Sequence, residues 1–398
     1  MSAALWPPAR QSEFMLNLPY WRLSGFYFFY FAFVGAMSPF WGLYLQSLAF
    51  NAFQIGVLMS LLQVMRIFAP NIWGHIADRT GRRTAIVQVA ALGSVLVFAG
   101  VFVGDGFWWL FAVMAAMSFF WSASLPLVEA TTLSHLGEHI HRYGRIRLWG
   151  SVGFILVVLA LGYAQDVLGI AWLPWAVLGF LAGTALFARW IPEAEVGVHA
   201  TDQHSVATVL RQKPVWGLLL ACFFMAAAHG PYYTFYTIYL VGSGYSPSQV
   251  GWLWAVGVIC EIAVFFWLPR LRDPVLLYRL LIGSLLTAAA RFTIIAWLPG
   301  SGAMMFLAQT LHAITFGVYH ASALALIHHY FRGRHQGRGQ GLYSSLSYGA
   351  GGAVGSLYAG WAWQDFGGRG TFMLAAACAL FAAAVAYYSR PFRPAVAA

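Results

Sequence analysis

The chain has 398 residues, of which 61% are hydrophobic and only 9% are charged, whereas a soluble domain carries about 25% charged residues. This composition excludes an ordinary soluble domain and indicates a protein embedded in a membrane. The formal charge of +10 does not indicate nucleic acid, because the arginines lie at the ends of apolar runs and no basic, polar domain is present to hold a duplex.

Twelve apolar runs are long enough to cross a bilayer, which takes about 20 helical residues each. The first six expected spans cover about 20–48, 53–73, 84–103, 107–133, 146–168 and 171–190. The last six cover about 215–241, 248–269, 275–298, 302–327, 339–364 and 370–389. We therefore predict an all-α membrane protein with twelve transmembrane helices in two six-helix, pseudo-symmetric halves.

The domain organisation follows from where polar residues gather. We expect an N-terminal half over 1–190, a linker over 191–214, a C-terminal half over 215–390 and a short tail over 391–398. Lys and Arg concentrate at one set of helix ends, which predicts that these ends, the linker and both termini are cytoplasmic. The first apolar run lacks a cleavage site of small residues, so we expect it to stay attached as a span.

Catalytic and metal-binding motifs are absent from the sequence. Neither a phosphate-binding P-loop nor a catalytic motif occurs, and the three cysteines, Cys222, Cys260 and Cys378, lie singly inside apolar runs. No metal-ligand spacing involves them. We therefore predict a protein that is not an enzyme and has no cofactor and no metal site.

The segment between the second and third expected spans carries the most specific motif. It reads GHIADRTGRR over residues 74–83 and places three arginines within five residues, which marks a cytoplasmic turn. The pattern resembles the loop between the second and third helices of the major facilitator superfamily. That resemblance implies that Asp78 caps a helix of the other half in one transport state, where a carboxylate is favoured at a helix N-terminus. It assigns conformational gating to Gly74, Asp78, Arg79, Gly81, Arg82 and Arg83.

An internal repeat supports two related halves. An offset of 195 residues aligns Gln54-Ile55-Gly56 with Gln249-Val250-Gly251, and Asp78 with Asp273. Such a parallel repeat is the arrangement of the major facilitator halves, which place the substrate site between them. The same offset sets Arg66 opposite Glu261, so each half carries one charge at the same depth of its second helix.

Among the charged residues inside the expected spans, those that we single out are Arg66, Glu129, Arg147, Glu261 and Arg291. A charge at a helix centre costs about 3 kcal/mol even on the lenient insertion scale, so these residues should pair or serve a function. We expect them to face a water-filled cavity between the halves. Structural ion pairs or snorkelling are the alternatives, most of all for Glu129 and Arg147.

The charge balance suggests an anionic substrate. With histidines neutral, three arginines face two glutamates, which leaves one positive charge uncompensated. A ligand carboxylate would pair with an arginine in bidentate geometry. His229 and His312 also fall near the middle of their spans, as binding residues or as hydrogen-bonding struts.

A second resemblance concerns the fourth and fifth spans. LVEA at 127–130 and YGRIRLWGSVGF at 143–154 resemble the same region of the lactose permease family. The resemblance implies substrate-binding roles for Glu129 and Arg147. Phe154 replaces the tryptophan that stacks on the sugar.

The tenth span resembles the same family. QTLH at 309–312 keeps the histidine as His312, while Gln309 replaces a lysine and Thr315 replaces the glutamate that carries the proton. Arg291 matches the arginine that lies beside that glutamate. Because this carboxylate is missing, we expect Glu261 to be the better proton carrier, with help from Arg291 and His312.

The phenylpropionate permease branch of the superfamily shows a closer likeness over essentially the whole chain. It rests on RLWGSV at 147–152 and on HGPYYTFY at 229–236. The aromatic cluster of the seventh span fits stacking against a phenyl ring, or an ordinary packing role. We assign Arg66, Glu129, Arg147, Phe154, His229, Tyr232 and Tyr236 to substrate binding.

We therefore predict a monomeric secondary transporter of a cell inner membrane that works by alternating access. It would import a small organic acid, such as 3-phenylpropionate, together with protons. Arg66 or Arg147 would bind the carboxylate, Glu129 would orient it and Glu261 would exchange the proton. The alternatives are a proton symporter of sugars or nucleosides, a drug exporter and, from another class, a transporter-like receptor.

Overall fold

A computed structural model describes residues 18–194, 207–267 and 273–391, and these residues form helices and connections without a strand. Ten segments of this part of the chain are long and apolar enough to cross a membrane. Two of them, Phe107–Leu168 with 62 residues and Gln336–Ser389 with 54, are long enough to cross twice. The prediction of an all-α membrane protein is confirmed, and twelve spans remain the count that we expect.

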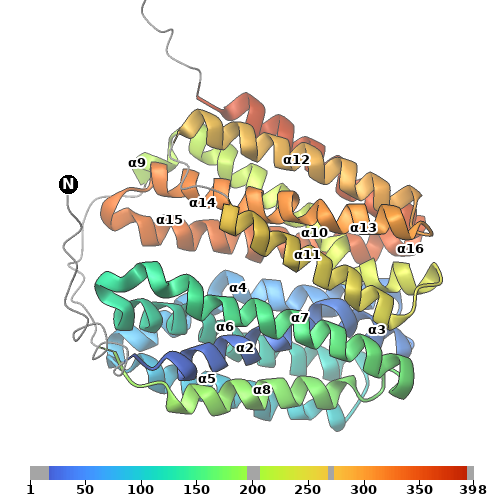
Figure 1. Ribbon diagram of the computed structural model, residues 1–398, viewed down its shortest axis with the longest axis horizontal. Coiled ribbons are helices and arrows are strands. Elements are labelled where there is room, and N and C mark those ends of the chain that lie inside the picture. Colours follow the sequence, from blue (N-terminus) through green and yellow to red (C-terminus); the bar gives the residue numbers. More distant parts are fainter. Residues whose placement is uncertain (1–17, 195–206, 268–272, 392–398) are drawn as a thin grey trace, which may run out of the picture.

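The helices before the linker form one bundle, drawn in blue to green in Figure 1. Its core helix α2 packs against α7 and α8, while α6 packs against α4 and α5. The helices are α2 (Tyr20–Ala36), α3 (Gly42–Ser47), α4 (Ala52–Thr80), α5 (Arg83–Phe98), α6 (Phe107–Leu136), α7 (Tyr143–Leu168) and α8 (Leu173–Trp190).

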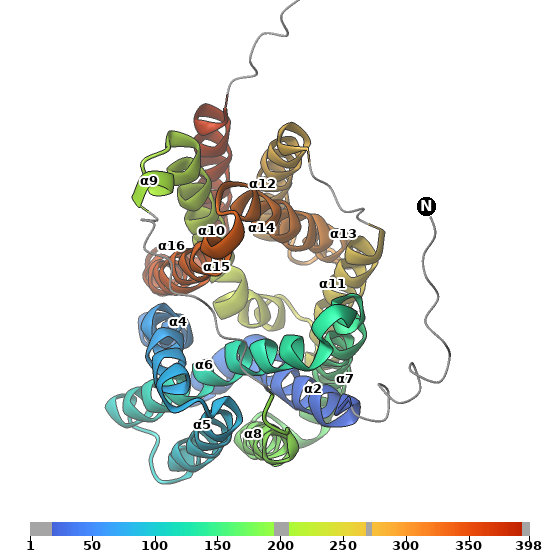
Figure 2. The ribbon, with the colours of Figure 1, turned by 90° about the vertical axis from the view of Figure 1, so that its left-hand side faces the viewer.

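The helices after the linker form the second bundle, in which α16 packs along α10 and α12. Figure 2 shows the two bundles facing each other, with α16 above α4 and α11 above α7. The helices are α9 (Ala207–Leu210), α10 (Lys213–Gly242), α11 (Pro247–Trp267), α12 (Pro274–Trp297), α13 (Gly302–Thr310), α14 (Tyr319–Tyr330), α15 (Gln336–Tyr343) and α16 (Gly352–Ser389).

The repeated Gln residues have a structural reason, because each closes a capping box. At the start of α4, the Gln54 amide donates to Asn51 Oδ1 at 2.9 Å and the Asn51 amide donates to Gln54 Oε1 at 3.0 Å. At the start of α11, Gln249 and Ser246 make the same reciprocal pair at 3.3 and 2.9 Å. The second helix of each bundle therefore begins in the same way.

The repeated glycines bring the two bundles together. A Cβ on Gly56 would lie 2.7 Å from the carbonyl oxygen of Ser356 in α16, and a Cβ on Gly251 would lie 2.6 Å from that of Val158 in α7. Real side chains do not approach backbone oxygens so closely. Both contacts therefore require glycine. Each glycine lies a few residues after the capping box that begins its helix.

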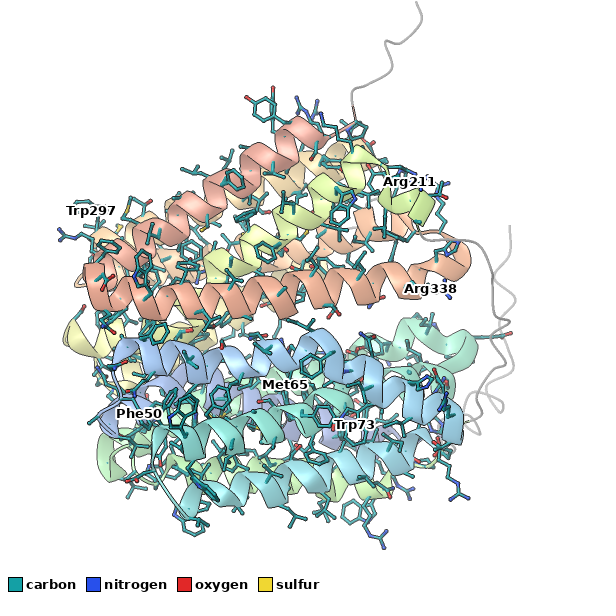
Figure 3. All side chains as sticks on the ribbon, turned by 180° about the vertical axis from the view of Figure 1, so that it is seen from behind. Phe50, Met65, Trp73, Arg211, Trp297 and Arg338 are labelled. Carbon is teal, nitrogen blue, oxygen red and sulfur yellow. The ribbon has the colours of Figure 1, made fainter. Side chains whose placement is uncertain are left out.

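Two basic residues mark the end of the molecule opposite to Phe50 and Trp297. Figure 3 shows Arg211 and Arg338 at one end, and Phe50 and Trp297 at the other. This separation agrees with the charge pattern of the sequence. That the basic end is cytoplasmic, with both termini, remains a prediction.

Three spans contain π-helical turns that the sequence did not predict. They cover Met37–Trp41, Ala313–Val318 and Ser344–Gly351. A π-turn widens a helix by one residue and is frequent at functional sites. The second follows His312 directly, and the third includes Tyr348, whose hydroxyl lies 2.8 Å from His320 Nδ1.

The predicted end of the second span at Trp73 is wrong. Helix α4 continues to Thr80, and Gly81 ends it in the left-handed conformation with φ 66°. Gly74 is therefore helical, and only Gly81 provides the turn. Arg66 precedes Thr80 by 14 residues, or about 21 Å, which places it deeper than the sequence suggested.

Other boundaries shift by a few residues. The connection between the expected spans 107–133 and 146–168 is shorter than predicted, because α6 reaches Leu136 and α7 begins at Tyr143, with a 3₁₀ turn at Gly137–Arg142 between them. The division into 1–190, 191–214, 215–390 and 391–398 remains a prediction. Residues 195–206 of that linker, 268–269 of the expected eighth span and 392–398 of the tail lie outside the described residues.

Candidate functional site

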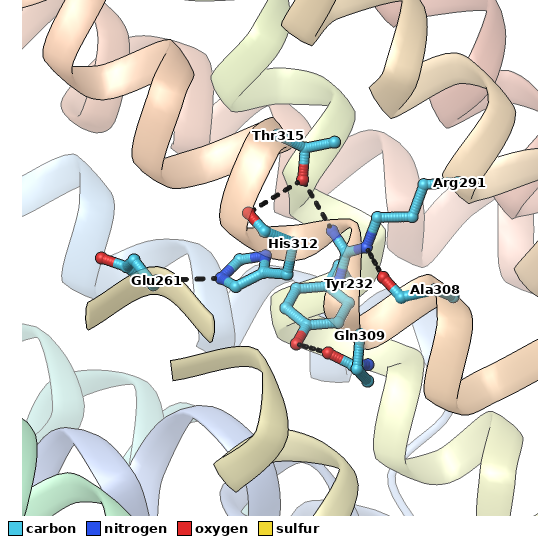
Figure 4. A network of polar contacts seen from close by, with 7 residues as sticks. All are labelled: Tyr232, Glu261, Arg291, Ala308, Gln309, His312 and Thr315. Carbon is cyan, nitrogen blue, oxygen red and sulfur yellow. Dashed lines mark hydrogen bonds and ion pairs between the residues drawn. The ribbon is translucent and has the colours of Figure 1, made fainter. Parts of the chain in front are cut away.

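Arg291 is the centre of a polar cluster in the second bundle (Figure 4). It lies on α12 and is 0% exposed. Its Nε donates to the carbonyl oxygen of Ala308 at 2.8 Å, and Nη1 donates to Thr315 Oγ1 at 3.5 Å. The guanidinium lies 4.3 Å from the ring centroid of Tyr232. The expectation that Arg291 faces a water-filled cavity is wrong, since helices α12 and α13 and the Tyr232 ring enclose it.

Tyr232, Gln309 and His312 surround the guanidinium. The Tyr232 hydroxyl donates to Gln309 Oε1 at 3.0 Å, and the Tyr232 ring stacks on His312 at 5.5 Å between centroids. His312 Nε2 lies 3.8 Å from Glu261 Oε2, and their side chains are 6% and 18% exposed. The residues predicted for proton coupling, Glu261, Arg291 and His312, therefore belong to one cluster.

His229 and Tyr236 lie behind Tyr232 on α10, and both are buried. His229 Nδ1 donates to the carbonyl oxygen of Met225 at 3.0 Å, one helical turn earlier. The ring of His229 lies 6.2 Å from that of His312. His229 is therefore anchored to the backbone through Nδ1, while its Nε2 has no hydrogen-bond partner among the described residues.

Glu129 and Arg147 form the polar centre of the first bundle. Tyr143 donates its hydroxyl hydrogen to Glu129 Oε1 at 3.1 Å. The Arg147 guanidinium lies 3.9 Å from the ring centroid of Phe31, and its charge acts on Glu129 within the bundle and on Glu261 across the interface. Arg147 therefore acts on the two carboxylates through space, since among the described residues neither forms an ion pair with it.

Arg66 stands apart from this group. Its Nη1 donates to Gln63 Oε1 at 3.3 Å, and its guanidinium lies 5.4 Å from the ring centroid of Trp121. Within the described part of the chain, no carboxylate pairs with Arg66 or Arg291. Because the charge of Arg147 already acts on both glutamates, we assign the surplus positive charge that the sequence indicated to Arg66 and Arg291.

Phe154 meets an aromatic partner that sequence reasoning missed. Its ring lies 6.5 Å from Trp254 of α11 in the other bundle, and Trp254 lies 4.5 Å from Tyr232. Trp254 Nε1 donates to Thr237 Oγ1 at 3.2 Å. An indole is therefore present near Phe154, but it comes from the second bundle, and only the fold reveals this.

The gating motif lies at the basic end. Asp78, Arg79, Gly81 and Arg82 are exposed, and among the described residues none hydrogen-bonds the Asp78 carboxylate. Glu193 occupies a comparable role nearby, because it accepts from the amide and hydroxyl of Thr84 at the start of α5, at 3.1 and 2.5 Å. The role of Asp78 as a cap in another transport state remains a proposal.

We expect Asp78→Asn to reduce the maximal uptake rate about fivefold, since a carboxylate at a helix N-terminus contributes about 1 kcal/mol. Its half-saturating substrate concentration should change less than twofold. Asp105→Asn is the matched control, because Asp105 is an exposed acid at the other end of the bundle. An unchanged maximal rate in Asp78→Asn would remove the gating role.

Charges on facing helices of two membrane-embedded bundles are typical of secondary transporters. The profile of the MFS_1 like family matches residues 20–374. The chain therefore belongs to this family, and the predicted resemblance to the major facilitator superfamily is confirmed. It is a multi-pass membrane transporter and not an enzyme.

Relatives with named activities cover most of the chain. The "Probable 3-phenylpropionic acid transporter" of Escherichia coli (strain K12) is 27% identical over 90% of this chain and 95% of its own length. The "Maltose permease" of Geobacillus stearothermophilus is 30% identical over 82% and 83%. Both are transporters of small molecules.

Two solved structures share the fold. The D323A mutant of the nucleoside transporter NupG superposes with a TM-score of 0.82 at 17% identity, over 94% of this chain and 100% of that one. A bacterial homologue of the human lysosomal transporter Spinster gives 0.72 at 15% identity, over 97% and 98%. These likenesses establish the arrangement of helices.

Proposed function

We propose that this transporter imports a small aromatic carboxylate, such as 3-phenylpropionate, in symport with protons across a cell inner membrane. The observation that carries the proposal is the Glu261–His312 pair beside an arginine without a counter-ion. Protonation neutralises a carboxylate and removes the cost of an intramembrane charge. A carboxylate substrate would neutralise the surplus guanidinium.

The ring of the substrate has partners as well. Tyr232, Trp254 and Phe154 form a chain of aromatic side chains across the interface, with centroids 4.5 and 6.5 Å apart. Aromatic pairs contribute about 0.5–1.5 kcal/mol beyond their buried area. The relative named for 3-phenylpropionic acid supports the same substrate class.

Arg66 and Arg147 are the proposed carboxylate ligands in the first bundle, and Glu129 orients the substrate. The electrostatic balance favours Arg66, since Arg147 already faces Glu129 and Glu261. The Arg147 guanidinium would release Glu261 when substrate binds, which couples the proton to the substrate. The protein would act as a monomer.

A proton symporter of sugars or nucleosides is the second candidate. It is favoured by the hydrogen bond from Tyr143 to Glu129, which leaves the other carboxylate oxygen for a hydroxyl, and by the maltose permease relative. A drug exporter is less compatible, because unpaired arginines repel cations.

Ligand binding to the purified protein separates these candidates. A ligand that binds only the folded state raises the melting temperature by mass action. We expect 3-phenylpropionate to stabilise the protein, while its neutral amide, maltose and uridine should not. Stabilisation by maltose or uridine alone would replace the proposed substrate class with the second candidate.

A further inference from the structure

Arg291 and three buried side chains around it carry nitrogen atoms that have no hydrogen-bond partner among the described residues. These atoms are Arg291 Nη2, Gln309 Nε2, His312 Nδ1 and His229 Nε2. Arg291 and Gln309 are 0% exposed, while His229 and His312 are 4% and 5% exposed. Unpaired buried polar atoms are costly, so a cluster of four calls for a ligand.

The chemistry of the cluster selects an anion. Arg291 Nη2 and Gln309 Nε2 can only donate. His312 Nδ1 donates when Nε2 of the neutral ring accepts from a protonated Glu261. His229 Nδ1 already donates to Met225, so its Nε2 accepts and is not a ligand for an anion. Arg291 Nε and Nη1 meet only neutral acceptors, namely Ala308 and Thr315. A buried charge without a counter-ion is strongly unfavourable.

Neighbouring side chains also enclose the cluster. The Tyr232 ring covers one face of the guanidinium, and Tyr232 is held by its hydrogen bond to Gln309. On the side of the bundle interface, the cluster ends at His312 and the partly exposed Glu261 (Figure 4). The π-helical turn Ala313–Val318 follows His312 directly and lets this segment adjust.

We propose that Arg291, Gln309 and His312 form a site for one monovalent anionic group, reached from the bundle interface when Tyr232 moves. The anionic group is either the carboxylate of the transported substrate or a free halide ion. Only the carboxylate source rests on the proposed function. The site differs from the carboxylate ligands proposed in the first bundle, because it lies wholly within the second, so a substrate with one carboxylate occupies only one of the two sites at a time.

The test is the thermal stability of the purified full-length protein in a halide-free buffer, titrated separately with chloride and with 3-phenylpropionate. We expect at least one of these anions to raise the melting temperature of the wild type, with no response in Arg291→Met. Arg369→Gln is the matched control, because this exposed arginine stacks on Trp297 outside the cluster, and it should respond like the wild type.

A second variant tests the site without removing the arginine. Thr315 Oγ1 lies 3.5 Å from Arg291 Nη1, so Thr315→Asp would supply an internal carboxylate of similar size. We expect this variant to melt at or above the wild-type temperature and to respond at least tenfold more weakly to the anion. Because Thr315→Asp keeps the arginine, it tests the proposed anion site even if Arg291→Met fails to fold.

The outcomes are distinct. A response to chloride alone, lost in both variants, supports the site and contradicts the proposed substrate. A response to 3-phenylpropionate alone, lost in both variants, supports the site with the substrate as its anion. Equal stabilisation of the wild type and both variants by 3-phenylpropionate overturns the site and leaves the proposed function standing. No response to either anion overturns the site.

Discussion

Replacing Glu261 by Gln should abolish uphill uptake while leaving exchange of substrate down its own gradient. Glutamine keeps the size of the side chain and its contact with His312 but cannot carry a proton. The accumulation ratio under an inward proton gradient should therefore fall to about one, since the carrier would only equilibrate the substrate.

The measurement is uptake and exchange of labelled substrate in proteoliposomes. Glu138→Gln is the control, because Glu138 is an exposed acid in the connection before α7. Accumulation by Glu261→Gln at the wild-type level would assign the proton to another group, of which Glu129 is the first candidate.

Replacing Gly251 by Leu should lower the maximal transport rate by about tenfold to hundredfold. The new Cβ would lie 2.6 Å from the Val158 carbonyl oxygen. The backbone of α7 cannot move aside as a flexible side chain can. Overpacking of this kind costs about 1–3 kcal/mol, and here the cost falls on the state in which α7 and α11 touch.

Gly283→Leu is the matched control, because no atom lies within 4 Å of a Cβ at this glycine of α12. Both variants should remain monodisperse and fold, and only Gly251→Leu should transport slowly. Equal maximal rates in the two variants would show that the close contact of α7 and α11 does not take part in the transport cycle.

The fold was predictable because apolar runs of this length have few alternatives in a bilayer. The repeat was also visible, and the structure supplies its meaning: Gln54 and Gln249 close capping boxes, while Gly56 and Gly251 allow the bundles to touch. Capping hydrogen bonds and close backbone contacts each depend on a few adjacent residues, so both are visible as a repeated pattern in the sequence.

The errors arose where tertiary structure overrides local pattern. Gly74 was interpreted as a turn, but glycine is tolerated inside a helix, and only the positive φ of Gly81 ends α4. The π-helical turns have no periodic signature, so the predicted spans were continuous.

The candidate site was predictable residue by residue but not as an arrangement. Charged residues in apolar runs identified Arg66, Glu129, Arg147, Glu261 and Arg291. Their grouping was not visible, since the effect of the Arg147 charge on Glu129 and Glu261 and the enclosure of Arg291 depend on how distant helices pack. Trp254 was missed because an indole in a membrane span is common and its neighbour Phe154 belongs to the other bundle.

The central claim is that a proton gradient drives accumulation of an aromatic carboxylate. The direct test is uptake of labelled 3-phenylpropionate into proteoliposomes of the purified protein, with and without an inward proton gradient. Because the neutral acid crosses bilayers unaided, uptake by protein-free liposomes under the same gradient is subtracted. We expect protein-dependent accumulation only with the gradient, and uptake equal to that of protein-free liposomes would contradict the claim.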